Sequence, residues 1–362
     1  MEVKDISGVM PTDSGVLSQM GSMGHEQVLF CQDKEVGLKA IIAVHNTVCG
    51  PSLGGTRMWN YASDEEALQD VLRLSRGMTY KNAISGLDLG GGKAVIIGDS
   101  RKDKSEALMR RFGQFVDSLG GKYITAEDVG ISPQDMSWVA METKHVAGLP
   151  GKSGDPSPVT AYGVYMGMKA SAKVQFGSDS LAGKKVAVQG VGHVGEYLLG
   201  YLQKEGAEIY ISDIHEETLN RVSREYGASV VGLDAIYDID MDIYAPCALG
   251  ATVNDDTLRR LKCSIIAGAA NNQLANELVH GEMVIEKGMI YAPDYLINAG
   301  GVMNCAGEVY NIDNDEVMSM AENIYNTTLA IIIKSREEGI PSYLAANIMA
   351  EERIAGLKKD KK

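Results

Sequence analysis

Two lysines and a run of glycines between Lys81 and Asp99 are the residues of this chain best suited to chemistry. Lys93 follows three consecutive glycines, Gly90 to Gly92, and lies twelve residues after Lys81. Glycines let a backbone approach a ligand where a Cβ would not fit, and a desolvated lysine loses its proton more readily than an exposed one. We therefore expect a glycine-rich loop that offers one fixed cation and one base usable near neutral pH.

This run does not fit a phosphate-binding loop. A Walker pattern, G-x-x-x-x-G-K-[ST], ending at Lys93 would need glycine at position 87 and serine or threonine at position 94. The chain has Leu87 and Ala94 there. On these residues alone, a glycine-rich turn with an exposed lysine remains an alternative.

Composition narrows the class of protein. A composition of 45% hydrophobic and 23% charged residues is typical of a globular protein, and the length of 362 residues favours two domains, with one large domain as the alternative. A net charge of −14 argues against nucleic acid or an anionic membrane as a partner. No uninterrupted apolar stretch reaches membrane-spanning length. The segment before Met23 lacks the pattern of a secretory signal and is expected to be a flexible leader.

Cysteine and histidine usage indicates neither disulfides nor a metal. The five cysteines are an odd number without a CxxC pair, and the six histidines show no HxxxH or HxH pair. We expect buried thiols, no metal site and a cytoplasmic location.

The first half of the chain predicts a mixed α/β domain. Strands are expected at 27–31, 38–45, 94–97 and 123–126. Helices are expected after Asp64 as the N-cap and at 104–119. The Gly- and Pro-rich stretch 148–156 predicts a boundary or hinge, after which a helix runs from Ser157 to about Ala172.

The second chemical signal is a complete strand–loop–helix–strand pattern. A strand at 185–189 precedes a G-x-G-x-x-G loop, a helix at 196–205 and a strand at 207–212, and this context predicts a dinucleotide site. The loop residues are Gly190, Val191, Gly192, His193, Val194 and Gly195. Its glycines would admit a pyrophosphate to the helix N-terminus. A nucleotide-free turn is the plain structural alternative.

Asp213 favours NAD over NADP. It lies 23 residues after Gly190, at the end of the second strand, where a carboxylate can bind both ribose hydroxyls and repel a 2′-phosphate. His193 is expected to face solvent as a spacer. Strands at 242–245 and 264–267 should continue a parallel sheet, and the loop after the latter carries Asn271 and Asn272. These asparagines are candidates for the nicotinamide side, or they cap a turn.

With these motifs the chain resembles the glutamate/leucine/phenylalanine/valine dehydrogenases, and most of all the leucine-specific branch, from about His25 to Gly356. The segments that carry the resemblance are GPSLGGTRMW at 50–59, RGMTYKNAISGLDLGGGKAVIIGD at 76–99, YITAEDVG at 123–130, DPSPVTAYGVY at 155–165, APCALGAT at 245–252, IAGAANNQL at 266–274 and APDYLINAGGVMN at 292–304. The resemblance implies reversible, NAD-dependent oxidative deamination of an L-amino acid to a 2-oxo acid and ammonia.

The resemblance also implies an architecture. An N-terminal α/β substrate-binding and oligomerisation domain would span 1–147, with a C-terminal helix, 343–362, packing back on it. A Rossmann NAD-binding domain would span 148–342, with a cleft between the two. The family further implies a homo-oligomer, often an octamer.

The resemblance also implies roles for individual residues, wherever this sequence matches a motif of the family. Lys93 matches the catalytic lysine and Asp128 the catalytic aspartate. Lys81 and the pair Gly54 and Gly55 match the residues that meet the substrate carboxylate. Thr160, Asn271 and Asn272 match positions near the nicotinamide and the substrate amine. The expected side-chain pocket consists of Leu53, Ala126, Val302 and Cys305.

The pocket predicts a branched aliphatic side chain, with leucine first. Glutamate dehydrogenases of the family carry a lysine where this chain has Leu53, and an apolar wall disfavours an unpaired carboxylate. Cys305 stands where the leucine-specific branch usually has valine, so the order among leucine, valine and isoleucine is left open. A dehydrogenase for phenylalanine or another apolar amino acid is one alternative, and a non-catalytic NAD-binding sensor is another.

Overall fold

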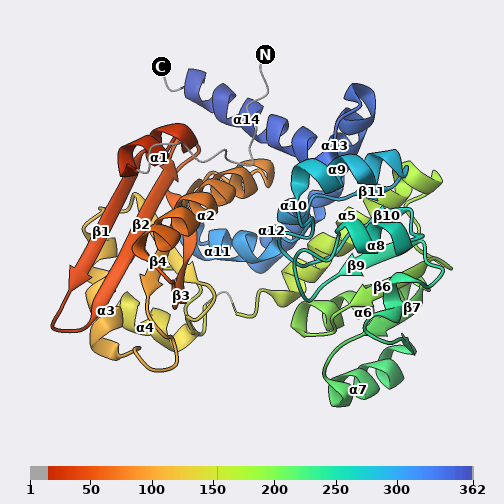
Figure 1. Ribbon diagram of the computed structural model, residues 1–362, viewed down its shortest axis with the longest axis horizontal. Helices are drawn as coiled ribbons and strands as arrows, with labels where there is room; N and C mark the ends of the chain where they lie inside the picture. Colours follow the sequence, from red (N-terminus) through yellow and green to blue (C-terminus); the bar gives the residue numbers. More distant parts are fainter. Residues whose placement is uncertain (1–14, 153, 361–362) are drawn as a thin grey trace. The chain divides into compact units, whose positions relative to one another are not determined.

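Two α/β units make up the protein in its computed structural model, which describes residues 15–152 and 154–360 (Figure 1). The first unit comprises Met1–Gly154, Cys305–Ile312 and Ala350–Lys362, and the second comprises Asp155–Asn304 and Asp313–Met349. Helices α11 (Gly300–Tyr310) and α14 (Ser342–Asp360) each contribute residues to both units. The predicted two-domain α/β fold is confirmed.

The first unit is built on a mixed five-stranded sheet of order β1-β2-β4-β3-β5. Its strands are β1 (Gln27–Asp33), β2 (Leu38–Asn46), β3 (Ser52–Trp59), β4 (Gly90–Ile97) and β5 (Tyr123–Glu127). The strand β2 runs antiparallel to β1 and β4, whereas β3 runs parallel to both β4 and β5. Four of these strands were predicted, and β3 was not.

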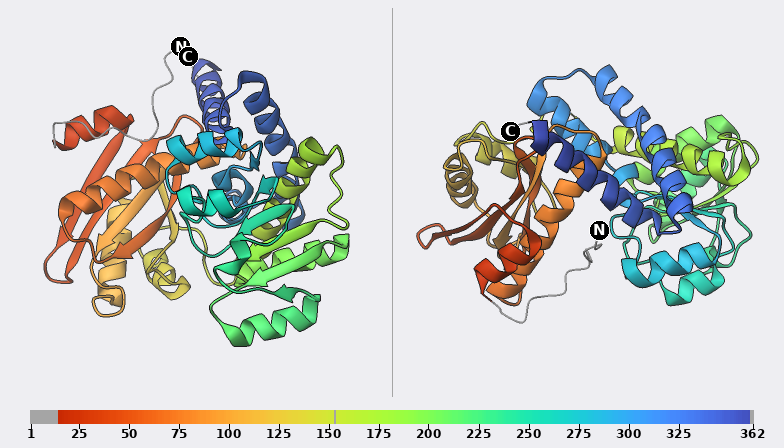
Figure 2. Two further views of the ribbon diagram at one scale, coloured as in Figure 1. Left: turned by 45° about the vertical axis from the view of Figure 1, so that its right-hand side comes forward. Right: turned by 90° about the horizontal axis from the view of Figure 1, so that it is seen from above.

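Helices cover both faces of this sheet. Helix α2 (Asp64–Ile84) packs on one face, and α3 (Glu106–Asp117) with α4 (Pro133–Ala140) packs on the other (Figure 2). The face under α2 buries Ile41 and Val95 against the apolar stripe of that helix. The opposite face buries a larger cluster that includes Phe112 and Tyr123.

The glycine run lies within a strand, so the predicted loop is wrong. Gly90, Gly91 and Gly92 are the first residues of β4, and all three are buried. A Cβ at Gly91 would overlap Thr79 of α2, and one at Gly92 would collide with the ring of Tyr123. These glycines therefore allow close packing of the sheet's own neighbours rather than the approach of a ligand.

Two further differences concern helix starts in this unit. Ser63 rather than Asp64 caps α2, because its hydroxyl accepts from the backbone of the first turn. Part of the predicted leader is helix α1 (Val16–Met23), and its last carbonyl accepts a hydrogen bond from His45 at 3.0 Å. Residues 1–14 of the leader lie outside the described residues.

The second unit is built on a six-stranded parallel sheet of order β11-β10-β9-β6-β7-β8. Its strands are β6 (Lys185–Gln189), β7 (Glu208–Ser212), β8 (Ser229–Val230), β9 (Ile243–Pro246), β10 (Ile265–Ile266) and β11 (Ile290–Tyr291). Read from β8, this is the order 3-2-1-4-5-6 of a dinucleotide-binding sheet, with its switch point between β6 and β9. The predicted Rossmann topology is confirmed.

The helices of the second unit are α5 (Ser157–Phe176), α6 (His193–Glu205), α7 (Glu216–Tyr226), η1 (Ala235–Tyr237), α8 (Asp255–Arg260), α9 (Glu277–Glu286), α10 (Asp294–Ile297), α12 (Asn314–Glu322) and α13 (Ile324–Glu338). Helix α5 outlasts its predicted end and stops at Gly177, which takes a left-handed φ of 78°. Helix α6 begins three residues before its predicted start, since Gly192 is its N-cap. Among the described residues, no helix is long and apolar enough to cross a membrane.

The packing of β4 leads to a stability prediction. Gly91→Ala should lower the free energy of unfolding by about 1–3 kcal/mol, because the new methyl group overlaps Thr79. Gly77→Ala is the matched control: Gly77 lies inside α2 with nothing within 4 Å of an added Cβ. It should stabilise the protein by about 0.5–1 kcal/mol. Urea unfolding of both variants at one protein concentration checks this, and equal stability of Gly91→Ala and wild type would contradict the packing argument.

Candidate active site

A buried ion pair lies on the α2-facing side of the first sheet. The Lys93 ammonium nitrogen is 2.8 Å from Oδ2 of Asp128. Lys93 is only 6% exposed, which excludes the alternative of an exposed lysine on a turn. A buried lysine paired with a carboxylate is expensive to desolvate, so its retention in a core strand points to chemistry rather than to stability.

Strand pairing brings the two residues together. Gly55 of β3 pairs with Ala126 of β5, and Thr56 pairs with Ala94 of β4, so Lys93, Gly55 and Ala126 lie side by side. Asp128 comes directly after β5 and turns back toward the same face. Leu53 is two residues before Gly55 and shares this face, because side chains alternate along a strand.

The pKa of Lys93 is lowered from its ordinary value. Burial is the largest cause, and the nearby Arg57 guanidinium adds to it, while Asp128 opposes it. The sequence predicted this direction from desolvation, and the structure adds the Arg57 guanidinium as a second cause. Lowering the pKa favours the neutral amine, the form of lysine that can act as a base.

Asp128 stays ionised in spite of its burial. Burial alone would raise the pKa of its carboxyl group, but Lys93 and Arg57 more than offset this, and the pKa falls below its ordinary value. The carboxylate is therefore a permanent acceptor beside a lysine that releases its proton readily.

Arg57 is a site residue that the sequence prediction missed. Its Nε lies 3.2 Å from Asp128 Oδ2, and its Nη1 lies 3.0 Å from Oδ2 of Asp70 on α2. Tyr61 donates to the same Asp70 oxygen at 2.7 Å. The signal was present in the sequence, since Arg57 follows Gly55 by two residues in an otherwise apolar segment. Its strand had not been predicted, so the shared face was not visible.

Lys81 lies half-buried in the last turn of α2. The C-terminal end of this helix is fixed by Arg353 of α14, which donates to the carbonyls of Ala83 and Leu87 at 3.0 and 2.8 Å. Arg353 also pairs with Asp88 at 3.1 Å. The helix end that carries Lys81 is thus held by the returning C-terminal helix.

The predicted glycine pair has a packing role of its own. A Cβ at Gly54 would overlap the carbonyl of Gly92, and one at Gly55 would overlap the carbonyl of Glu127. Glycine is therefore needed at both positions for the sheet to form, whether or not a substrate carboxylate lies against them.

The predicted pocket residues are apolar, and all are buried except Cys305, which is half-buried. Leu53 is 1% exposed and Ala126 is 6% exposed, both on the face that carries Lys93. Cys305 belongs to the first unit, and burial raises the pKa of its thiol to about 12, so it remains neutral. Val302 is buried in the second unit.

The second unit carries the predicted nucleotide loop at its switch point. A Cβ at Gly190 would collide with Ala248, so the loops after β6 and β9 meet. A Cβ at Gly195 would overlap the carbonyl of Gly190, which explains the third glycine by close helix packing. Gly192 has open space around it and caps α6 without a side chain, so the helix N-terminus is accessible to a phosphate.

Asp213 orders this loop. Its Oδ2 accepts from the Val191 backbone at 2.8 Å, and its Oδ1 accepts from the His215 backbone at 2.9 Å. The carboxylate therefore lies beside the glycine loop, as a ribose-binding acid requires. Val194 is half-buried in the first turn of α6, and His193 is exposed, as expected for a spacer.

The remaining candidates lie near helix and strand ends of the second unit. Thr160 is buried in the first turn of α5, and its hydroxyl donates to the Pro156 carbonyl at 3.0 Å. Asn271 and Asn272 are exposed. Asn271 accepts from the Asn298 amide at 2.7 Å, and Asn272 takes a left-handed φ of 52°, which gives it a turn role of its own.

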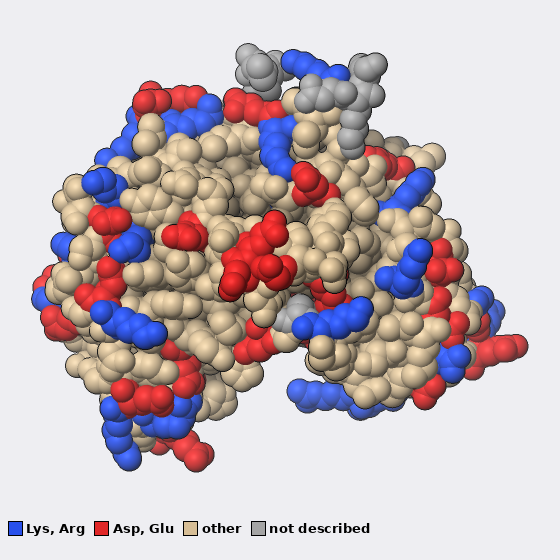
Figure 3. Space-filling view, turned by 180° about the vertical axis from the view of Figure 1, so that it is seen from behind, with Lys and Arg blue, Asp and Glu red and all other residues tan. Residues whose placement is uncertain are grey.

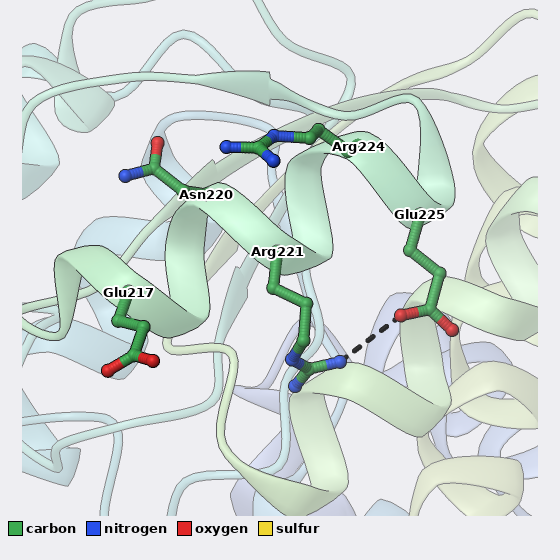
Figure 4. Close-up of a pocket in the computed structure, with 5 residues that line it drawn as sticks. All are labelled: Glu217, Asn220, Arg221, Arg224 and Glu225. Carbon is green, nitrogen blue, oxygen red and sulfur yellow. Dashed lines mark hydrogen bonds and ion pairs between the residues drawn. The ribbon is translucent and has the colours of Figure 1, made fainter.

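Two other surface features are separate from these groups. A hollow on α7 is lined by solvent-facing side chains, with an ion pair between Arg221 and Glu225 at 3.1 Å (Figure 4). Its lining is Glu217, Asn220, Arg221, Arg224 and Glu225. On the face drawn in Figure 3, lysine and arginine are interspersed with aspartate and glutamate. Among the described residues, no cluster of three or more histidine, cysteine or acidic side chains could hold a metal ion.

Comparison with known protein families identifies the family of this chain. Residues 25–145 match the family described as Glu/Leu/Phe/Val dehydrogenase, dimerisation domain, and residues 211–361 match Glutamate/Leucine/Phenylalanine/Valine dehydrogenase. The chain belongs to the Glu/Leu/Phe/Val dehydrogenase family. The resemblance drawn from its motifs is confirmed.

Individual members of the family match over almost the whole chain. Leucine dehydrogenase from Thermoactinomyces intermedius is 56% identical over 347 residues, covering 95% of this chain and 94% of that protein. Leucine dehydrogenase from Bacillus subtilis (strain 168) is 54% identical, covering 94% of each. The crystal structure of L-tryptophan dehydrogenase from Nostoc punctiforme is 45% identical with a TM-score of 0.87, covering 95% of this chain and 99% of that one.

The ion pair of this Glu/Leu/Phe/Val dehydrogenase leads to a pH-dependent stability prediction. Asp128→Asn should lower the free energy of unfolding at pH 7 by up to about 3 kcal/mol, because it leaves Lys93 buried without its counter-charge. Asp128 raises the pKa of Lys93, so the pKa should fall further in the variant.

The pH dependence of this effect comes from Lys93. Because the pKa of this lysine is lower in the folded than in the unfolded chain, the free energy of unfolding rises with pH and falls as pH drops through the folded pKa. The difference in free energy of unfolding between wild type and Asp128→Asn should therefore become smaller between pH 7 and about 10. The double variant Lys93→Met/Asp128→Asn should show no such narrowing. Denaturant unfolding at pH 7 and at alkaline pH measures this, and a deficit of the single variant that is constant with pH would refute it.

Proposed function

We propose that this chain is an NAD-dependent dehydrogenase that oxidatively deaminates a branched-chain aliphatic L-amino acid, leucine first, to its 2-oxo acid and ammonia, and catalyses the reverse amination. Relatives named leucine dehydrogenase are 54–56% identical over nearly its full length. The structural observation that carries the proposal is the buried pair of Lys93 and Asp128, with the pKa of Lys93 lowered. A non-catalytic sensor would have no use for such a pair.

The second unit fits NAD as the cofactor. The open N-terminus of α6 at Gly192 can receive the pyrophosphate, and Asp213 can bind the adenosine ribose. When bound, NAD supplies a hydride acceptor for the hydrogen on the substrate Cα. We assign the positions beside the nicotinamide and the substrate amine to Thr160, Asn271 and Asn272.

Lys93 acts as the general base in this proposal. Its neutral amine takes a proton from the water that attacks the imine carbon of the oxidised substrate, and the resulting ammonium hydrogen-bonds the developing oxygen. Asp128, held ionised, receives and returns the proton of the substrate nitrogen. The reaction therefore starts from a neutral Lys93 amine and an ionised Asp128 carboxylate.

Lys81 fixes the substrate in the same proposal. Its ammonium pairs with the α-carboxylate, and the flat backbone of Gly54 and Gly55 leaves room for that group. Leu53, Ala126, Val302 and Cys305 form the side-chain pocket, whose apolar lining suits an aliphatic substrate.

Several broader features belong to the proposal as well. The domains are 1–147 with the C-terminal helix, and 148–342, and the predicted cleft between them remains a prediction. A homo-oligomer is supported by the description of the matched N-terminal family as a dimerisation domain, and we propose an octamer. A cytoplasmic location is supported by five cysteines that are all free thiols.

A substrate and cofactor panel tests the function. With NAD, kcat/KM should be highest for leucine, valine or isoleucine and lower for phenylalanine and tryptophan, because the pocket is lined by small and aliphatic side chains. NADP should be used poorly, since Asp213 repels a 2′-phosphate. A preference for tryptophan or phenylalanine would replace the aliphatic assignment by an aromatic one. Comparable kcat/KM for NAD and NADP would refute the role of Asp213.

Lys93→Ala should remove turnover while leaving the fold and NAD binding nearly unchanged. Loss of a general base lowers kcat by about 10²–10⁴-fold. The matched control is Lys39→Ala, on the neighbouring strand β2, where the lysine is exposed and pairs with Asp64 at the surface. Steady-state kinetics with leucine and NAD binding by fluorescence check this. A Lys93→Ala variant that retained a tenth of wild-type kcat would exclude the base role.

Leu53→Lys should lower activity on leucine. The substitution places an ammonium group in an apolar wall, at a cost of several kcal/mol, about 2–7. Leu53→Met, which keeps an apolar side chain, is the control and should retain most activity. Kinetics on leucine and glutamate decide the assignment, and glutamate turnover would show that the new cation admits an acidic side chain. Unchanged kcat/KM for leucine in the folded lysine variant would mean that Leu53 does not contact the substrate.

A further inference from the structure

Arg57 lies between two carboxylates from different elements. Its Nε lies 3.2 Å from Asp128 Oδ2, after β5, and its Nη1 lies 3.0 Å from Asp70 Oδ2, on α2. The side chains of all three are largely buried, with 23% of Arg57, 25% of Asp128 and 15% of Asp70 exposed. The planar guanidinium can make both contacts at once, which an ammonium group cannot do in the same geometry.

The contact with Asp128 involves the same oxygen that binds Lys93. Lys93 Nζ is 2.8 Å from Oδ2, and Arg57 Nε is 3.2 Å from it. A carboxylate oxygen that serves one lysine alone holds the proton on that lysine strongly. An oxygen shared with a permanent cation holds it less strongly, and the two cations also repel each other.

Asp70 fixes the far side of Arg57. Its Oδ2 accepts from Tyr61 at 2.7 Å as well as from Arg57, and its Oδ1 accepts from Arg73 at 2.9 Å. Tyr61 and Arg57 share Oδ2, and this shared contact holds the guanidinium in one orientation, whereas Arg73 binds the other oxygen from the surface. Asp70 and Tyr61 thereby set how closely Arg57 approaches Asp128.

We propose that Arg57 is a positioning residue of the dehydrogenase reaction, which holds the Asp128 carboxylate and, as a second cation on its Oδ2, eases the release of the Lys93 proton. Asp70 has the opposite effect on Lys93, because it adds a negative charge nearby. This proposal rests on the proposed function, since it assigns a step of that reaction to Lys93.

The groups that face Lys93 agree with these signs. From β3, Arg57 lowers the pKa of Lys93, whereas Asp128 after β5 and Asp70 on α2 raise it. Burial is the largest cause of the lowered pKa of Lys93, and it stays the same when Arg57 or Asp70 is replaced. Removing Arg57 or Asp70 should therefore move the pKa of Lys93 in opposite directions.

The test compares the pH dependence of kcat for leucine oxidation in wild type, Arg57→Gln, Asp70→Asn and Arg73→Gln. Arg73 is the matched control, because it pairs with Asp70 but not with Asp128, and its side chain is 59% exposed. The leucine ammonium titrates identically for all four proteins, so differences among them report the enzyme.

The acid limb is the decline of kcat at low pH, where Lys93 becomes protonated. We expect this limb to move to higher pH by about half a unit to one unit in Arg57→Gln, and to lower pH in Asp70→Asn. Arg73→Gln should leave it unmoved. A merely structural role would change thermal stability and kcat without shifts of opposite sign. Arg57→Lys keeps the positive charge but loses the planar guanidinium that contacts both carboxylates, so its acid limb should lie between those of wild type and Arg57→Gln.

The outcomes separate the two proposals. A wild-type chain inactive on every amino acid of the panel would reject the proposed function, and the role of Arg57 with it. An active wild type whose pH limb is unmoved in Arg57→Gln, or moves in the same direction in Arg57→Gln and Asp70→Asn, would reject the role of Arg57 alone. Should Arg57→Gln not fold, the shift of Asp70→Asn to lower pH decides, and its absence rejects the role.

Discussion

The desolvation of Lys93 is the constraint on which the first unit depends. A lysine at 6% exposure in the middle of a sheet loses most of its hydration, and only a nearby carboxylate makes its charged form tolerable there. The strand that carries it is packed against α2 and its neighbouring strands, and this packing removes Lys93 from most of its contact with solvent. Proton release by Lys93 is thus built into the packing of the sheet.

Charge balance around this lysine is kept by a group of four residues. Lys93 and Arg57 supply two positive charges, and Asp128 and Asp70 supply two negative charges, linked in the order Lys93, Asp128, Arg57, Asp70. Neither cation has a carboxylate to itself at its closest contact. Arg73, which pairs with Asp70 from the surface, adds a third positive charge, so loss of the Lys93 proton leaves these five residues without net charge. Arg57 thereby favours the neutral form of Lys93.

Prediction from sequence succeeded where a pattern is local. The G-x-G-x-x-G loop, its flanking strands and Asp213 are contiguous, and the parallel sheet order follows from them. Lys93 and Asp128 were assigned from family motifs, and the structure places them in contact. The functional roles of these residues remain to be tested by the variants above.

Prediction failed where a residue's role depends on what packs against it. The run Gly90 to Gly92 was taken for a ligand-binding loop, because glycine freedom is visible in sequence and a neighbour such as Thr79 is not. Arg57 was missed for a related reason. Its partners Asp70 and Asp128 lie 13 and 71 residues away, and they reach Arg57 only through the packing of α2 on the sheet and the pairing of β3 with β5.

The close packing of β4 restricts how the sequence of this strand can vary. Gly90 abuts Asn46 of β2, Gly91 abuts Thr79 of α2, and Gly92 abuts Tyr123 of β5. Each glycine is thus tied to a different element, and replacing any of them requires a compensating change elsewhere in the chain. In a mutant library that varies Gly90 to Gly92 singly, most variants would fail to fold correctly. Evolution of this fold can therefore change its loops and surface far more freely than β4, whose sequence is fixed by three separate neighbours.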